Sequence, residues 1–142
     1  MGARAQELLQ DFQLRQTDSR IAVLDFMLLH PRAISQPELE QQLSDRFDRV
    51  TLYRTLNTFS EKGLIHEVSD TSGTMKFALC GDACHNETHI HHHEHVHFHC
   101  STCQQTVCIN EVDVPQLSLP KGFLPQKFSF IIEGICQHCQ KN

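Results

Sequence analysis

The sequence predicts an α+β fold, with an N-terminal winged helix-turn-helix domain followed by a small C-terminal α/β domain that holds a four-cysteine zinc site. The first third of the chain has apolar residues at helical spacing, and the chain after residue 63 turns to β-prone runs. Two Cys-x-x-Cys motifs flank the last of these runs. We divide the 142 residues into domains at 1–79 and 95–142, joined by a loop rich in His and Cys at 80–94.

A helix is predicted over residues 17–30, where apolar residues recur every three or four positions. Thr17 is a suitable N-cap, because its hydroxyl can accept a hydrogen bond from a free amide of the first turn. Pro31 then ends the helix. A shorter helix is expected before residue 14.

Two further helices are predicted before the change of pattern. Ser35 is the expected N-cap of the first, with Pro37 in its first turn, and this helix should end near Phe47. The second covers residues 50–62. Gly63 closes it, because glycine readily adopts the left-handed conformation that ends many helices.

A two-stranded hairpin follows, with strands at 64–70 and 75–80 and a turn in which Gly73 supplies the positive φ. Three helices followed by a hairpin is the order of a winged helix-turn-helix domain. In such a domain the helix before the hairpin, here residues 50–62, enters the major groove of DNA.

The C-terminal part has β-prone runs at 95–100, 106–112 and 127–134, and the turn or loop at 119–122 precedes the last of them. The two Cys-x-x-Cys motifs lie at the ends of this region and contribute four thiolates: Cys100, Cys103, Cys136 and Cys139. Two such turns complete a tetrahedral shell with Zn–S distances of about 2.3 Å. A closed shell favours structural zinc over catalytic zinc; the alternatives are a redox disulfide pair or ordinary buried cysteines.

Histidine is concentrated in one stretch, with eight of the eleven histidines between His85 and His99. If residues 95–100 form a strand, His95 and His97 point to one face, roughly 7 Å apart along the strand, and can share a metal ion. The alternative is a solvated histidine-rich face with loose affinity for metal.

Composition excludes some classes of protein. No apolar run approaches the roughly 20 residues of a membrane span, and we expect a cytoplasmic protein in a reducing compartment, where paired cysteines bind metal more often than they form disulfides. The net charge is −5. Residues 1–79 hold nine Lys/Arg against eleven Asp/Glu, and residues 80–142 hold three against six. Binding to nucleic acid must therefore depend on a local patch.

Several segments together resemble the ferric uptake regulator (Fur) family of metal-responsive transcriptional repressors, and the resemblance covers nearly the whole chain. The segments are Thr17-x-x-Arg20, Val50-Thr51-Leu52-Tyr53-Arg54-Thr55-Leu56, Lys62-Gly63-Leu64-Ile65, and His95-x-His97-x-x-Cys100-x-x-Cys103. The resemblance implies a homodimer, whose C-terminal domains dimerise and whose winged helices bind a palindromic operator in double-stranded DNA. Metal at a regulatory site near the hinge would favour the DNA-binding form.

The ligand pattern resembles the zinc uptake regulator branch most closely. That resemblance implies a regulatory site made of His66, Cys80, His95 and His97, a set of three nitrogens and one sulfur that suits tetrahedral Zn²⁺. Cys84 is an alternative to Cys80. The other loop histidines, His85 and His89 to His93, are interpreted as groups that deliver or buffer metal.

Iron and peroxide sensors of the family typically use a harder shell that contains oxygen. By this resemblance, Ala33 and Ala78 align with a histidine and a carboxylate of that shell. Nearby His30 is a possible substitute, although its position favours a helix end. The resemblance therefore implies an incomplete iron-type shell.

Two more family positions differ in this chain. Cys108 stands where the family often has an acidic residue; it is either an additional soft ligand or, as we favour, a core strand residue. A further family metal site is expected to be absent, because Glu94, Val96 and Phe128 occupy its places.

The resemblance also implies which residues contact DNA. Tyr53 and Arg54 match family positions that contact bases and phosphates, by ring packing on a thymine methyl group or by hydrogen bonds to phosphate or guanine. The full predicted set is Arg20, Thr51, Tyr53, Arg54 and Asn57.

The function predicted from these patterns is a zinc-responsive repressor of metal-uptake genes. An iron-, manganese- or peroxide-responsive member of the same family, with Fe²⁺ or Mn²⁺ at the regulatory site, is the main alternative. A metalloenzyme is disfavoured, because no carboxylate occupies a position suited to a general base. A histidine-rich metal store would not need a winged helix.

Overall fold

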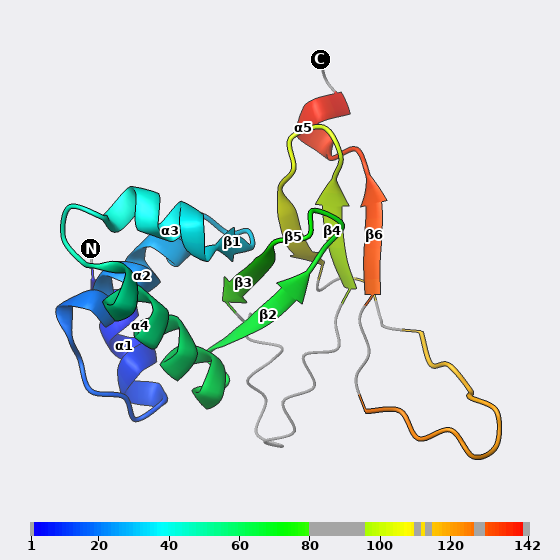
Figure 1. The fold of residues 1–142 in the computed structure, drawn as a ribbon, viewed down its shortest axis with the longest axis horizontal. Coiled ribbons are helices and arrows are strands. Elements are labelled where there is room, and N and C mark those ends of the chain that lie inside the picture. Colours follow the sequence, from blue (N-terminus) through cyan, green and yellow to red (C-terminus); the bar gives the residue numbers. More distant parts are fainter. Residues whose placement is uncertain (1, 80–95, 110–111, 113–114, 127–129, 141–142) are drawn as a thin grey trace.

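The computed structural model describes residues 2–79, 96–109, 112, 115–126 and 130–140. The α+β prediction is confirmed: a helical N-terminal half lies beside a C-terminal sheet, and a hairpin lies between them (Figure 1). The N-terminal helices are α1 (Ala3–Asp11), α2 (Asp18–Leu29), α3 (Gln36–Leu43) and α4 (Arg49–Lys62). No helix in these ranges is long and apolar enough to cross a membrane.

The predicted helix ends are largely confirmed, because capping depends on local sequence. The Thr17 hydroxyl accepts a hydrogen bond from the Arg20 amide at 3.3 Å, and Ser35 accepts one from the Glu38 amide at 3.3 Å. Gly63 ends α4 with φ 78°. The prediction that α3 continues to Phe47 is wrong. It ends at Leu43, because the chain must turn before the N-cap of α4.

Replacing Thr17 by Ala should lower the free energy of unfolding by about 1 kcal/mol, since the first turn of α2 loses the acceptor for one of its free amides. Chemical denaturation of the two proteins measures the difference. Gln16→Ala, at the exposed preceding residue, is the matched control and should change stability by a few tenths of a kcal/mol at most. Equal effects of the two substitutions would contradict the capping role.

The wing is a three-stranded antiparallel sheet in the order β1-β3-β2, made of β1 (Ile34–Ser35), β2 (Ile65–Ser69) and β3 (Met75–Leu79). The predicted hairpin is confirmed, with Gly73 at φ 81° in its turn. Strand β1 was not predicted, because two residues are too few to show a period. The sheet packs on the helices through one apolar core that contains Leu9, Leu24, Leu52, Phe59 and Ile65.

The C-terminal sheet has the order β5-β4-β6, made of β4 (Val96–Cys100), β5 (Thr106–Ile109) and β6 (Phe130–Gly134). β4 is antiparallel to β5 and parallel to β6. Each of the three predicted runs is thus confirmed as a strand in the part that the structure describes, and residues 95, 110–111 and 127–129 of these runs lie outside it. The short helix α5 (Gln137–Gln140) was not predicted; it follows β6 at the end of the sheet away from the projecting segment 115–126 (Figure 1).

Candidate metal centre

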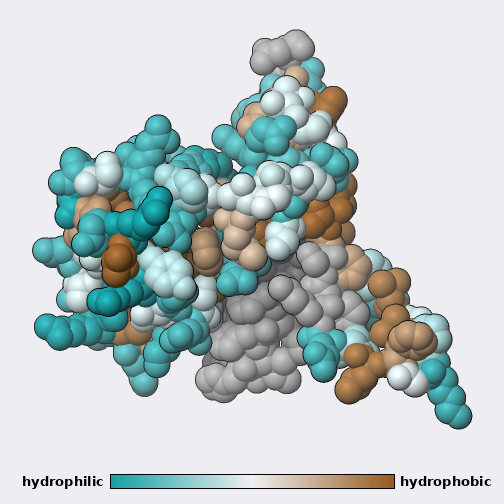
Figure 2. Space-filling model, in the orientation of Figure 1, coloured by the Kyte–Doolittle hydropathy of each residue, from teal (hydrophilic) through white to brown (hydrophobic). Residues whose placement is uncertain are grey.

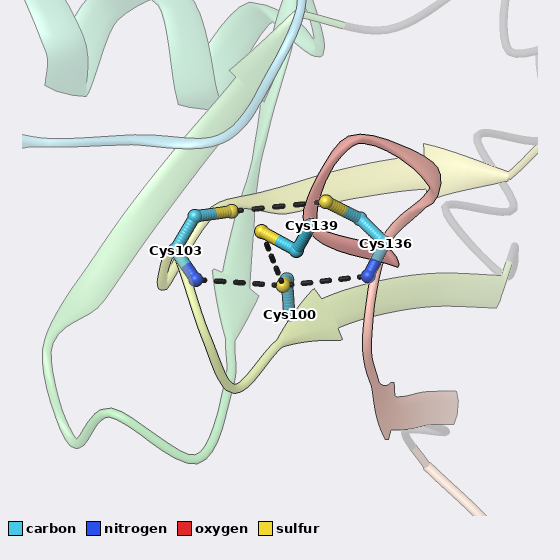
Figure 3. A group of neighbouring side chains, drawn as sticks. All are labelled: Cys100, Cys103, Cys136 and Cys139. Carbon is cyan, nitrogen blue, oxygen red and sulfur yellow. Dashed lines mark hydrogen bonds between the residues drawn. The ribbon is translucent and has the colours of Figure 1, made fainter. Parts of the chain in front are cut away.

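Four cysteine side chains meet at one end of the C-terminal sheet (Figure 3). Cys100 is the last residue of β4, and Cys103 lies in the turn that leads to β5. β6 runs parallel to β4 with Gly134 opposite Cys100, so the chain brings Cys136 and then Cys139 of α5 to the same end. Two turns distant in sequence therefore face each other.

The sulfur–sulfur distances fit a tetrahedral ion. Cys100 Sγ lies 3.8 Å from Cys139 Sγ, and Cys103 Sγ lies 3.9 Å from Cys136 Sγ. Two thiolates bound to one ion at about 2.3 Å stand about 3.8 Å apart in a regular tetrahedron. The two sulfurs of a disulfide bond lie about 2.05 Å apart, so these four cysteines are not paired as disulfides.

The backbone favours a thiolate at the centre of this cluster. The amides of Cys103 and Cys136 donate to Cys100 Sγ at 3.5 and 3.4 Å. These hydrogen bonds lower the pKa of Cys100 to about 5. Hydrogen bonding among the neighbouring thiols raises the pKa of Cys139 to about 12, which means that the four sulfurs do not all ionise until a cation compensates their charge.

A second cluster lies where the wing meets the C-terminal sheet. His66 of β2 and His97 of β4 are both buried, and their Nε2 atoms lie 3.1 Å apart. Cys108 Sγ of β5 lies 3.7 Å from His66 Nε2. Nitrogen ligands of one tetrahedral ion stand about 3.3 Å apart, and a nitrogen and a sulfur about 3.6 Å. The three side chains therefore have the spacing of ligands to a single ion.

The structure brings together two of the four predicted regulatory ligands, His66 and His97. The other two, Cys80 and His95, lie outside the described residues, as do Cys84 and the loop histidines. Cys108 completes the described cluster instead. Its partial burial against the small core around Ala33 and Ala78 agrees with the interpretation as a strand residue, but its sulfur also faces the histidines.

The position of Cys108 follows from the strand register. The Cys100–Cys103 turn closes the β4–β5 hairpin with His99 opposite Thr106, which places His97 opposite Cys108 on the same face. The signal in the sequence is the Cys-x-x-Cys turn between two β-prone runs, which indicates a hairpin but does not fix its register.

Comparison with known proteins agrees with this architecture. The profile of the ferric uptake regulator family matches residues 11–121. The ferric uptake regulation protein of Staphylococcus aureus (strain Mu50) is 32% identical over 94% of this chain and 94% of its own length. The chain belongs to the ferric uptake regulator family.

Solved structures of this fold include members named for different metals. The Vibrio cholerae ferric uptake regulator has a TM-score of 0.58 at 24% identity, covering 92% of this chain and 98% of its own. Holo XcZur has a TM-score of 0.66 at 18% identity, covering all of both chains. As a member of the Fur family, the chain is a metal-responsive transcriptional regulator and not an enzyme.

In this Fur-family chain, the two residues predicted to align with ligands of an iron-type shell are apolar. Ala33 and Ala78 are each 3% exposed and pack against Val68. His30 Nδ1 lies 2.9 Å from the Phe26 carbonyl oxygen and belongs to neither cluster of the described residues. Of the places of the further family site, Val96 is buried and apolar, and Glu94 and Phe128 lie outside the described residues.

The predicted DNA-contacting residues lie on or beside α4. Tyr53, Arg54 and Asn57 are exposed, with Tyr53 at 52% although it is aromatic. The Thr51 amide donates to the N-cap Asp48 at 2.7 Å, which fixes the start of the helix. Arg20 of α2 is partly buried, and its guanidinium donates to the Arg15 carbonyl at 2.8 Å.

Proposed function

We propose that this chain is a zinc-responsive repressor, in which Zn²⁺ bound at the joint between wing and C-terminal sheet stabilises the DNA-binding form. The observation that carries the proposal is the cluster of two buried histidines, His66 and His97, with the partly buried Cys108. Its ligands come from both sides of the joint, on β2, β4 and β5. An ion held by all three is therefore sensitive to how the two halves sit together.

The chemistry of the ligands supports zinc at this regulatory site. Imidazole and thiolate are the usual donors to Zn²⁺, whereas a mixed shell with carboxylate suits Fe²⁺ and Mn²⁺ better. We propose Cys80 and His95 as further ligands of the same ion. Because a tetrahedral shell holds four ligands, we propose Cys108 as an alternative to Cys80 for the sulfur position. Buried Ala33 and Ala78 offer no donor for an iron-type shell.

We also propose that Cys100, Cys103, Cys136 and Cys139 bind a structural Zn²⁺. The closed four-sulfur shell and the near-tetrahedral sulfur spacing support this assignment. Cysteines in such a set must stay reduced, which fits a cytoplasmic regulator.

The fold offers a direct route from metal to DNA. Gly63 ends α4, and His66 follows three residues later on β2, so a constraint on His66 bears on the helix that presents Tyr53, Arg54 and Asn57. In physical terms, a metal that binds the closed form better shifts the population toward it by no more than its difference in affinity.

A homodimer would place two such helices on a palindromic operator. The C-terminal half carries exposed apolar side chains on β6 and on the projecting segment 115–126, and Figure 2 shows apolar surface gathered on that segment. They include Leu117, Leu119, Phe123, Leu124 and Ile132. Apolar area of this kind marks a protein interface, and we propose that a second copy covers it.

The iron-responsive alternative has one observation in its favour: curated relatives at 30% and 32% identity are named ferric uptake regulation proteins. Two imidazoles also bind Fe²⁺. The softer shell and the alanines weigh against it.

Operator binding in metal-buffered solution tests the proposal. A DNA site is first obtained by in vitro selection with the zinc-loaded protein and, separately, with the iron-loaded protein. We expect a palindromic site that is bound by two chains, with affinity that rises as free Zn²⁺ is raised and stays low at equal free Fe²⁺ or Mn²⁺. The Tyr53→Ala protein is the matched DNA-binding control, and should lose operator affinity without losing metal. Selective response to Fe²⁺ would overturn the zinc assignment.

A further inference from the structure

A polar network joins the wing to the C-terminal sheet, and it contains no residue of the four-cysteine cluster or of the cluster of His66, His97 and Cys108. Asp70 at the wing turn accepts a hydrogen bond from the Thr106 hydroxyl at 2.6 Å, and the Lys76 ammonium lies 2.8 Å from the same Oδ2. Lys76 also donates to the Gln104 carbonyl at 3.1 Å. We call Asp70, Lys76 and Thr106 the Asp70 network.

The Asp70 network is buried. The side chain of Asp70 is 0% exposed and that of Lys76 is 12% exposed, although both belong to a surface hairpin. His99 Nδ1 lies 2.8 Å from the Thr106 hydroxyl oxygen. Because that hydroxyl gives its only proton to Asp70, the ring nitrogen of His99 is the donor in this contact.

Burial and hydrogen bonding act in opposite directions on the pKa of Asp70, and the hydrogen bonds have the larger combined effect. Burial alone would raise the pKa of this carboxyl, but hydrogen bonds from Lys76, Ser72 and Thr106 hold it well below its usual range. A carboxyl with a depressed pKa stabilises the fold above its unfolded pKa and loses this contribution only as the pH falls through the folded pKa. The network is therefore charged at neutral pH.

Other contact between the two halves, among the described residues, consists mainly of the histidine cluster and of a small apolar cluster in which Cys108 and Ile131 pack against Ala33, Val68 and Ala78. The strongest packing lies within each half, between the strands of each sheet and among the helices. A cleft of about 800 Å³ separates the end of α2, at Leu29 to Arg32, from Phe98 and Val107 of the C-terminal sheet. Polar bonds at the wing, which include the hydrogen bond from the Ala33 amide to the Thr106 carbonyl at 2.6 Å, are a separate part of the connection.

The C-terminal side of the Asp70 network lies, in sequence, between residues of the two metal clusters. Its C-terminal partners, Gln104 and Thr106, fall between Cys103 of the four-cysteine cluster and Cys108 of the regulatory cluster. Gln104 has φ 66°, a left-handed conformation imposed by the tight turn, and its carbonyl accepts from Lys76. On the wing, Asp70 directly follows β2, the strand that carries His66.

We propose that Asp70 is a positioning residue for the regulatory site. Its bonds to Lys76 and Thr106 hold the β2–β3 hairpin against β5, so that His66 stays at ligand distance from His97 and Cys108. The metal then meets a preformed site and does not have to draw the halves together. The effect on metal affinity rests on the proposed function, whereas the effect on the joint does not.

Amide hydrogen exchange tests the joint directly, in full-length protein with the four-cysteine site loaded and no metal at the regulatory site. The Ala33 amide reports closure, because its acceptor is across the joint. In Asp70→Asn we expect this amide to exchange on the order of tenfold faster, since the negative charge that pairs with the buried Lys76 ammonium is lost. Lys76→Met should act in the same direction and serves if Asp70→Asn folds poorly.

Cobalt binding then tests the link to the metal site. Thiolate-to-cobalt absorption from the regulatory site should show affinity weaker by on the order of tenfold in both variants, as is usual when supporting groups of a metal site are lost. Glu67→Gln is the matched control: it removes one carboxylate from the same strand at an exposed position and should change neither readout.

The outcomes separate the two ideas. Unchanged Ala33 exchange in both Asp70→Asn and Lys76→Met overturns the proposal, and so does faster exchange with unchanged cobalt affinity. If the wild-type protein binds no operator in response to zinc, the proposed function fails, while the exchange result still decides whether the Asp70 network holds the joint.

Discussion

Replacing Cys136 by Ala is expected to unfold the C-terminal domain. Among the described residues of this domain, Val96 and Cys100 are the only buried apolar ones, and its three strands have four or five residues each. So small a core cannot fold the sheet alone. Structural zinc in small domains contributes about 10–16 kcal/mol that is also folding free energy, and a three-thiolate site forfeits a large part of it.

Circular dichroism and zinc content per chain measure this effect, and treatment of the wild-type protein with a strong chelator should reproduce it. Cys108→Ala is the matched control, because it removes a cysteine of the same domain that lies outside the four-sulfur cluster. It should keep the fold and one tightly bound zinc. A Cys136→Ala protein as stable as Cys108→Ala would refute the structural role of the four-cysteine cluster.

Replacing His97 by Ala should abolish the zinc dependence of operator binding while the fold remains. The His97 side chain contributes Nε2 to the cluster between β2, β4 and β5. Without this nitrogen, the C-terminal sheet offers one ligand fewer to an ion that must hold the two halves together. Operator affinity at saturating free zinc should fall by about 5- to 150-fold, the usual range of allosteric coupling, to the level of the protein with an empty regulatory site.

Fluorescence anisotropy with labelled operator provides the measurement. His30→Ala is the control, because His30 is a histidine near the joint that lies in neither cluster of the described residues. It should retain the zinc response. Loss of response in His30→Ala with retention in His97→Ala would move the regulatory site toward the alternative that His30 supplies a ligand.

Local features of this fold were predictable from sequence, because their determinants lie within a few residues. Thr17, Ser35 and Gly63 mark helix ends through hydrogen bonds or backbone conformation that involve only neighbouring residues. The four-cysteine cluster was predictable for a related reason: each Cys-x-x-Cys turn is local, and a tetrahedral shell needs two of them.

Features that depend on pairing across the chain were harder to predict. Cys108 lies beside His97 because of the β4–β5 register, and an isolated β-prone run does not reveal its register. In the sequence, Asp70 is only the last residue of the predicted strand 64–70. Its partner Thr106 lies 36 residues away, and only the packed structure shows that they meet.

One short strand serves both metal clusters, since β4 carries His97 near its middle and Cys100 at its end. Under the proposed zinc chemistry, the sensing ligands are assembled only in a chain whose four-sulfur site is already filled. A newly synthesised molecule would therefore acquire its two ions in a set order, with the four-sulfur site filled before the sensing site.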